Sequence, residues 1–113
     1  MRQTTCYVKV LRVRPRFHSG TVVVTEGIRN ALSLWEIHRL LGRHAHGDWG
    51  SGYVGRCSPN ERFLRLGLRL DSHYRLGGRD VLITTDPVSL ASGARPFTTV
   101  YLFGEYSQVH HLA

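Results

Sequence analysis

The chain has 113 residues, of which 42% are hydrophobic; this length suits one core and is too short for two independently stable domains. No apolar run approaches the roughly 18 residues that cross a bilayer, and charged residues interrupt the N-terminal stretch where a signal peptide would be apolar. We therefore expect one cytoplasmic domain over residues 1–113, without a membrane anchor.

Fifteen Lys and Arg side chains against eight Asp and Glu give a net charge of +7, which excludes an acidic mimic of DNA. Lys9 is the only lysine, and the arginines can bind phosphate or carboxylate groups through a bidentate fork. The charge either serves binding to a nucleic acid or an acidic protein, or reflects a GC-rich genome.

Cys6 and Cys57 lack CxxC spacing, so two reduced thiols are expected, with a disulfide or shared metal as the alternative.

Two short strands are expected near the N-terminus. Residues 7–14, YVKVLRVR, alternate apolar and basic side chains up to Pro15, which makes 1–17 a basic, strand-like extension. Residues 21–25, TVVVT, are β-branched and predict a second strand, buried if all three valines face the core. Glu26 and Gly27 are expected to break this run before one or two helical turns over 28–32.

The best-defined helix is predicted over 34–44. Ser33 and Glu36 have the spacing of a capping box, and Gly47 is the natural stop. The apolar residues that follow recur at helical spacing, which predicts an amphipathic helix: Leu34, Ile37, Leu40, Leu41 and Ala45.

The second half alternates loops, a helix and strands. The glycine-rich segment 47–57 predicts a loop held by burial of Trp49 and Tyr53, and the spacing of Ser58 and Glu61 predicts a capping box before a helix over 59–66. Strands are predicted over 68–74, 80–85 and 97–103, with Gly77-Gly78 as a hairpin turn between the first two. The expected fold is α+β, with a mainly antiparallel sheet of four or five short strands and two helices on one face.

The segment RHAHGDWG, residues 43–50, resembles a family of small bacterial, phage and plasmid proteins described only as hypothetical or plasmid-related, and sometimes mislabelled as restriction-enzyme subunits. The likeness spans a core of residues 20–106 and ends in TTVYLFGEY. Between these motifs, it continues in register through Asn60, Leu64, Gly67, Arg69, Ser72, Tyr74, Gly77-Gly78 and VLITTD. It departs from the family in the acid-free segment after HGDWG, the longer loop 87–97 and the added residues 1–17. The resemblance implies no known enzymatic activity and suggests an accessory role on mobile elements, such as interference with host defence.

His44, His46 and Asp48 form an H-x-H-x-D spacing that also occurs in metal-dependent hydrolases. The helix, however, would turn His44 about 200° away from His46, so no bound metal is expected. The preferred interpretation is a helix-to-loop corner in which Asp48 caps backbone amides and Trp49 packs in the core. No nucleophile elbow or phosphate-binding loop occurs, so neither a catalytic residue nor a cofactor is expected.

The candidate partner-binding residues combine the N-terminal basic row with the neighbourhood of HGDWG: Arg12, Arg14, Arg16, Arg43, His46, Asp48, Trp49 and Arg56. In a strand the first three would share one face, either as a phosphate-binding edge or as protection against edge-to-edge pairing.

Three functional hypotheses follow. The first is a non-enzymatic counter-defence inhibitor of the anti-CRISPR or anti-restriction type, which occludes a host nuclease or effector complex. The second is a small basic nucleic-acid-binding accessory or regulatory protein, and the third is a metal-dependent hydrolase. None of them requires a membrane, and the sequence does not fix the oligomeric state.

Overall fold

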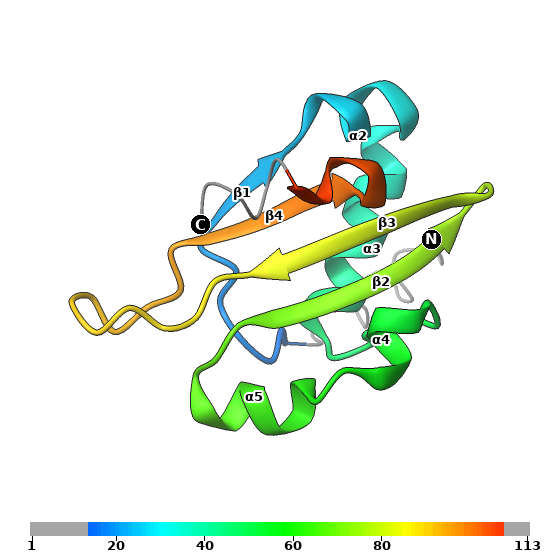
Figure 1. Ribbon diagram of the computed structural model, residues 1–113. Coiled ribbons are helices and arrows are strands. Elements are labelled where there is room, and N and C mark those ends of the chain that lie inside the picture. Colours follow the sequence, from blue (N-terminus) through cyan, green and yellow to red (C-terminus); the bar gives the residue numbers. More distant parts are fainter. Residues whose placement is uncertain (1–13, 108–113) are drawn as a thin grey trace, which may run out of the picture.

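The computed structural model describes residues 14–107 and contains one four-stranded sheet (Figure 1). Its strands are β1 (Thr21–Val24), β2 (Leu70–Leu76), β3 (Arg79–Thr85) and β4 (Phe97–Leu102). The strand order is β1-β4-β3-β2, with β1 parallel to β4 and the other two pairs antiparallel. The expected α+β fold with a mainly antiparallel sheet is confirmed.

Two helices cover one face of the sheet, as expected: α2 (Glu26–Ala31) and α3 (Leu34–Ala45), which lies behind the strands in Figure 1. Two shorter helices, α4 (Tyr53–Cys57) and α5 (Asn60–Leu66), lie beside β2, and a 3-10 turn, η1 (Phe103–Glu105), follows β4. None of the helices in the described part of the chain is both long and apolar enough to span a membrane.

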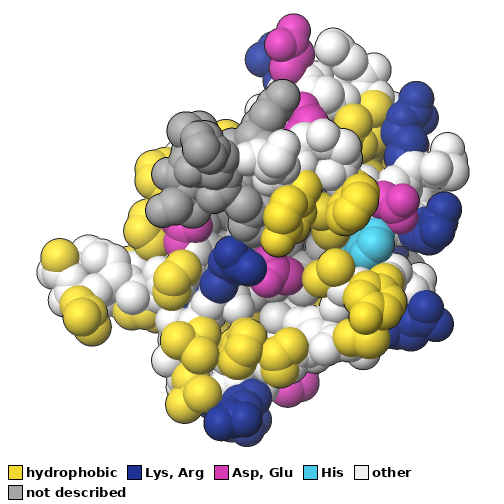
Figure 2. Space-filling model, in the orientation of Figure 1, with side chains coloured by type: hydrophobic (Ala, Val, Ile, Leu, Met, Phe, Trp, Pro, Cys, Tyr) yellow, Lys and Arg dark blue, Asp and Glu magenta, His cyan; other side chains and the backbone are white. Residues whose placement is uncertain are grey.

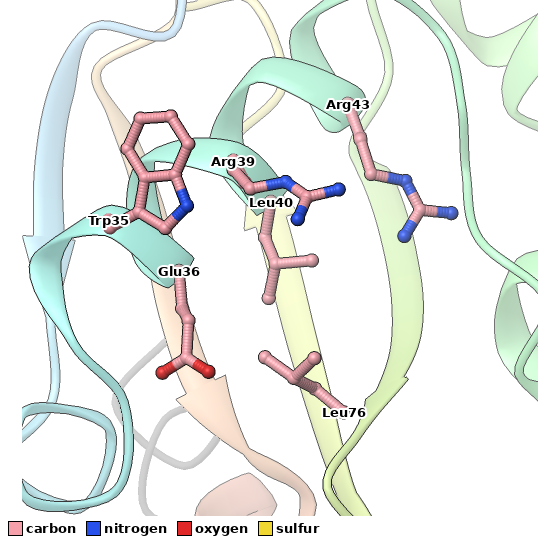
Figure 3. A pocket seen from close by; sticks show the side chains of 6 residues that line it. All are labelled: Trp35, Glu36, Arg39, Leu40, Arg43 and Leu76. Atoms are coloured by element: carbon pink, nitrogen blue, oxygen red, sulfur yellow. The ribbon is translucent and has the colours of Figure 1, made fainter.

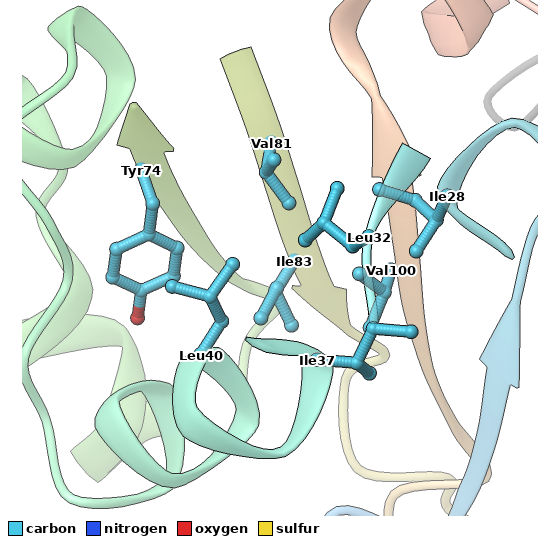
Figure 4. Packing of buried hydrophobic residues seen from close by; sticks show 8 residues of the cluster. All are labelled: Ile28, Leu32, Ile37, Leu40, Tyr74, Val81, Ile83 and Val100. Carbon is cyan, nitrogen blue, oxygen red and sulfur yellow. The ribbon is translucent and has the colours of Figure 1, made fainter. Parts of the chain in front are cut away.

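The hydrophobic core lies between the α2–α3 layer and the sheet (Figure 4). Both layers contribute side chains that are at most 8% exposed: Ile28, Leu32, Ile37, Leu40, Tyr74, Val81, Ile83 and Val100. Burial of these side chains supplies the main favourable term in folding.

The helix starts agree in part with the sequence. Ser33 and Glu36 form the predicted capping box, with bonds of 3.1 Å from the Glu36 N–H to the Ser33 hydroxyl and 2.8 Å from the Ser33 N–H to the Glu36 carboxylate. The strand ends before Glu26 and Gly27, as predicted, but the helix begins at Glu26 instead of residue 28, because Thr25 caps α2 and these two residues form its first turn. The Gly27 N–H also donates to Glu105 at 3.2 Å, a long-range contact that a local pattern does not reveal.

The glycine hairpin is confirmed. Gly77 and Gly78 have φ of +59° and +77°, the left-handed values that a two-residue turn between antiparallel strands requires.

Four sequence expectations need correction. The segment 47–57 is not loop throughout, since it contains α4, and Tyr53 is 72% exposed instead of buried. The Ser58 capping box does not form; Pro59 takes the N-cap position of α5 without a side-chain cap. Leu34, assigned to the apolar stripe of α3, is 75% exposed. Val22 and Val23 are 42% and 40% exposed, because β1 is an edge strand.

The predicted N-terminal strand over 7–14 lies, except for its last residue, outside the described part of the chain, as do Cys6 and Arg12. Arg14 and Arg16 lie in an irregular segment, so the strand does not continue through them. Cys57 is a free, exposed thiol at the end of α4.

Candidate functional site

His44 lies at the centre of a buried polar chain between α3 and the sheet. It is fully buried, and its Nδ1 and Nε2 lie 2.5 Å from the Ser72 hydroxyl and 2.8 Å from the Thr85 hydroxyl. The Thr85 hydroxyl in turn lies 2.7 Å from the Thr98 hydroxyl. The Thr98 hydroxyl donates to the Ser19 carbonyl, also at 2.7 Å.

The direction of this chain fixes the histidine tautomer. Since the Ser19 carbonyl can only accept, the Thr98 proton is used there and Thr85 must donate to Thr98. The His44 Nε2–H therefore donates to Thr85, and Nδ1 accepts from Ser72. Burial, and secondarily the charge of Arg95, lower the pKa of His44 from 6.5 to about 3, so the neutral ring is the stable form.

Asp48 forms the corner that follows α3. Its carboxylate accepts from the Arg43 guanidinium at 2.7 and 3.3 Å and from the Gly50 N–H at 3.2 Å, and the Arg43 hydrogen bond holds the pKa of Asp48 below its ordinary value. The Asp48 carbonyl accepts from the Tyr74 hydroxyl at 2.6 Å, and the Arg43 guanidinium lies 4.6 Å from the centre of the Tyr74 ring. Asp48 thus caps a backbone amide, as the corner interpretation requires.

Trp49 joins the corner to α5 and to the N-terminal segment. Its indole N–H donates to Glu61 at 3.0 Å, and Glu61 accepts a bidentate pair from Arg16 at 2.8 and 2.9 Å. The Arg16 and Trp49 hydrogen bonds lower the pKa of Glu61 to about 2. Phe17 stacks on Trp49, with 6.3 Å between the ring centroids. Trp49 is half-buried and packs against the N-terminal segment, so the expectation that it packs in the core is wrong.

The same corner covers the outer edge of β2. The Trp49 carbonyl accepts from the His73 N–H, and the Gly52 N–H donates to the His73 carbonyl, both at 3.0 Å. Asn60 is 1% exposed and bonds both backbone groups of Asp71, donating at 2.6 Å and accepting at 3.1 Å. These contacts satisfy backbone groups that would otherwise make β2 an open edge.

The H-x-H-x-D residues do not converge on a common point. Both ring nitrogens of His44 are used inside the core, His46 bonds the Gly42 carbonyl at 2.7 Å, and Asp48 faces Arg43. Across residues 14–107, no three His, Cys, Asp or Glu side chains are grouped as metal ligands. The metal-dependent hydrolase hypothesis therefore gains no support from this arrangement.

The predicted partner-binding residues are brought together only in part. Arg16, Arg43, Asp48 and Trp49 meet around the corner, where Arg16 and Arg43 are already paired with carboxylates. Arg14, His46 and Arg56 are exposed, with Arg56 on α4.

A groove beside α3 combines apolar and cationic side chains that the sequence reasoning did not single out (Figure 3). It has a volume of about 220 Å³ and is lined by Trp35, Glu36, Arg39, Leu40, Arg43 and Leu76. Trp35, Arg39 and Arg43 follow each other at four-residue spacing, which places them along one side of the helix. The indole of Trp35 is 72% exposed, whereas Leu40 is buried and Leu76 half-buried.

A second hollow of about 270 Å³ shares Glu36 and Leu76 with this groove and extends to Arg79 of the hairpin. The side chains of Arg39 and Arg79 are exposed and form no ion pair with other residues of the described range. We call the two hollows together the α3 groove. A tryptophan on the solvent side of an amphipathic helix was the signal in the sequence that could have revealed it.

In the view of Figure 2, the basic side chains of the described residues lie in separate groups. No model of a protein family matches the chain, and neither does any curated protein or any solved structure.

Proposed function

We propose that the protein is a non-enzymatic binding protein that holds an acidic segment of a partner protein in the α3 groove. The observation that carries this proposal is Trp35, which is 72% exposed and lines the same groove as the buried Leu40 and the half-buried Leu76. A large exposed aromatic ring costs solvation free energy in the free protein, and partner binding recovers it.

The composition of the α3 groove is that of a protein interface. Tryptophan and arginine are enriched among the residues that dominate binding energy, and lysine is depleted from interfaces. Arg39 and Arg79 offer unpaired guanidinium groups to carboxylates, and Glu36 is committed to its capping box. The partner segment should therefore carry an apolar side chain for the Trp35 surface and acidic side chains beside it.

The partner's identity is a separate part of the proposal. The resemblance of the core to proteins of mobile elements supports a counter-defence inhibitor, in which an occupied α3 groove covers part of a host nuclease or effector complex. That resemblance is the only support for this role.

Nucleic acid is the second candidate partner, favoured by the same Trp35 and Arg39, because exposed aromatic rings stack on unpaired bases while arginines bind phosphates. The two candidates differ in their salt dependence. Affinity for nucleic acid should fall steeply with salt as counterions are released, whereas a partner held through Trp35 should depend on salt only weakly.

The test compares two aromatic side chains of equal exposure. Trp35 and Tyr53 are both 72% exposed, but Tyr53 lies on α4, outside the α3 groove. Partners captured from nuclease-treated lysate are identified, and their affinity is measured for the wild type, Trp35→Ala, Arg39→Glu and Tyr53→Ala.

We expect Trp35→Ala and Arg39→Glu to weaken binding at least tenfold and Tyr53→Ala to leave it unchanged. Equal binding by all four proteins would refute the α3 groove as the binding surface. Partners that appear only with intact nucleic acid would favour the second candidate.

A further inference from the structure

Among residues 14–107, strand β1 forms an edge of the sheet. The Thr21 and Thr25 N–H groups donate to the Pro96 and Val100 carbonyls of the β4 side, at 2.9 and 3.1 Å. Because backbone groups alternate in direction along a strand, Val22 and Val24 point their N–H and C=O groups away from β4. Within residues 14–107 nothing pairs with this outer edge, since β1 terminates the strand order.

The β1 edge lacks the usual protection against strand pairing. Natural edge strands carry lysine, proline, bulges or inward charges, whereas residues 17–25, FHSGTVVVT, contain no Lys, Arg, Asp, Glu or proline. Val22 and Val23 are 42% and 40% exposed, and Phe97, the β4 neighbour of Thr21, is 46% exposed. The other edge of the same sheet, β2, is covered by Trp49, Gly52 and Asn60.

We propose that β1 pairs with β1 of a second copy of this chain, antiparallel across a two-fold axis, so that two four-stranded sheets become one. The favoured register places Val23 opposite Val23 of the second copy and Val22 opposite Val24. This register brings the outward backbone groups of both strands face to face and forms four hydrogen bonds. An axis through Val22 would instead oppose Val24 to Gly20, which lies outside the strand.

The charge distribution favours a second copy as the occupant. Two chains of net charge +7 repel each other over most of their surface, so they can meet only where charge is absent. The β1 edge is uncharged, and the same strand can pair with itself across a two-fold axis. The side chains of Val23 and Phe97 lie on the same face of the sheet. An acidic partner gains no counter-charge there.

This inference is independent of the function proposed for the α3 groove. The α3 groove lies beside α3 and the β2–β3 hairpin, and β1 and β2 are opposite edges of the sheet. A four-residue strand gives a small interface, so we expect a reversible dimer whose population rises with protein concentration.

The oligomeric state is tested by sedimentation of the full chain over a range of concentrations. Val22→Pro removes an outward N–H that no bond within the monomer uses, a position where edge strands tolerate proline, and it should abolish the dimer. Val23→Lys places like charges opposite each other across the axis and should weaken dimerisation at least tenfold. Val88→Lys is the matched control, since Val88 is 38% exposed and lies in the loop before β4; it should leave the dimer intact.

Mixing two variants gives a test that does not depend on loss of function. Val23→Lys and Val23→Asp should each be monomeric, and their mixture should form a heterodimer because opposite charges then meet on the axis. A wild type that stays monomeric at every concentration would overturn the proposal. So would a dimer that survives both Val22→Pro and Val23→Lys.

Discussion

Replacing His44 with glutamine should remove most of the acid sensitivity of the fold between pH 7 and pH 5. The neutral ring forms hydrogen bonds with the Ser72 and Thr85 hydroxyls inside the core. Burial lowers the pKa of His44 from 6.5 to about 3. In the unfolded chain the same ring titrates near its ordinary value, so unfolding below that pH takes up a proton. The stability that neutral His44 contributes is therefore complete above pH 6.5 and is lost as the pH falls toward 3.

The size of the effect follows from the pKa shift. Each pH unit below 6.5 costs about 1.4 kcal/mol, so the free energy of unfolding should fall by about 2 kcal/mol on reaching pH 5. The carboxylates whose pKa is lowered, Glu61, Asp48, Asp80 and Glu105, lose their contributions only below about pH 4.5 and leave this window clear.

Urea titrations followed by tryptophan fluorescence at half-unit pH steps measure this dependence. His44→Gln should be less stable than the wild type at pH 7 and nearly flat between pH 7 and pH 5. His38→Gln is the control, because His38 is an exposed residue of the same helix, and this variant should keep the wild-type slope. The reasoning fails if the wild type is flat over this range or if His44→Gln retains the slope.

Three further predictions address the covered edge and the corner. Gly50→Ala should destabilise the fold by about 3 kcal/mol, because Gly50 has φ of +90° and an added Cβ would lie 2.1 Å from the His73 carbonyl oxygen. Gly42→Ala is the control in the same urea assay. Gly42 lies on α3 with open space around it, so this variant should stabilise the fold by about 0.5–1 kcal/mol. Asn60→Ala leaves both backbone groups of Asp71 without their partner and should cost about 2 kcal/mol, with faster hydrogen exchange of the Asp71 amide as the specific readout. Glu61→Gln should change stability by less than about 1 kcal/mol and by nothing measurable at high salt, since its pair with Arg16 is exposed.

Elements with local signals could be predicted from the sequence. The Ser33–Glu36 capping box lies within four residues and formed as expected, and the Gly77-Gly78 turn needs only two left-handed residues. The spacing of Ser58 and Glu61 is the same as that of the first box, yet no box formed there. Glu61 instead binds Arg16, 45 positions earlier, and Trp49, and such a competing partner is invisible to a local pattern.

The candidate site was harder to predict, because the inward face of α3 includes a histidine. Ile37, Leu40 and His44 are the buried residues of this helix, whereas the apolar Leu34 and Trp35 are 75% and 72% exposed. A pattern that assigns large apolar residues to the core therefore wrongly places Leu34 in the core. The same pattern does not identify Trp35 as an exposed residue that could contact a partner. The buried hydroxyls of Ser72 and Thr85, 28 and 41 positions later in the chain, explain why an imidazole occupies the core.

Several residues of the HGDWG and TTVYLFGEY motifs, and of the segment between them, build the scaffold. Asp48 and Asn60 bond backbone groups, and Ser72, Thr98 and Glu105 bond partners within the chain. Residues of this kind maintain the fold, so they do not identify a partner. The two proposed binding surfaces, the α3 groove and the β1 edge, lie on different parts of the fold, so a dimer formed at β1 would leave the groove accessible. Two copies joined at β1 would present two α3 grooves, so a partner with repeated acidic segments should bind the dimer more tightly than one groove alone allows.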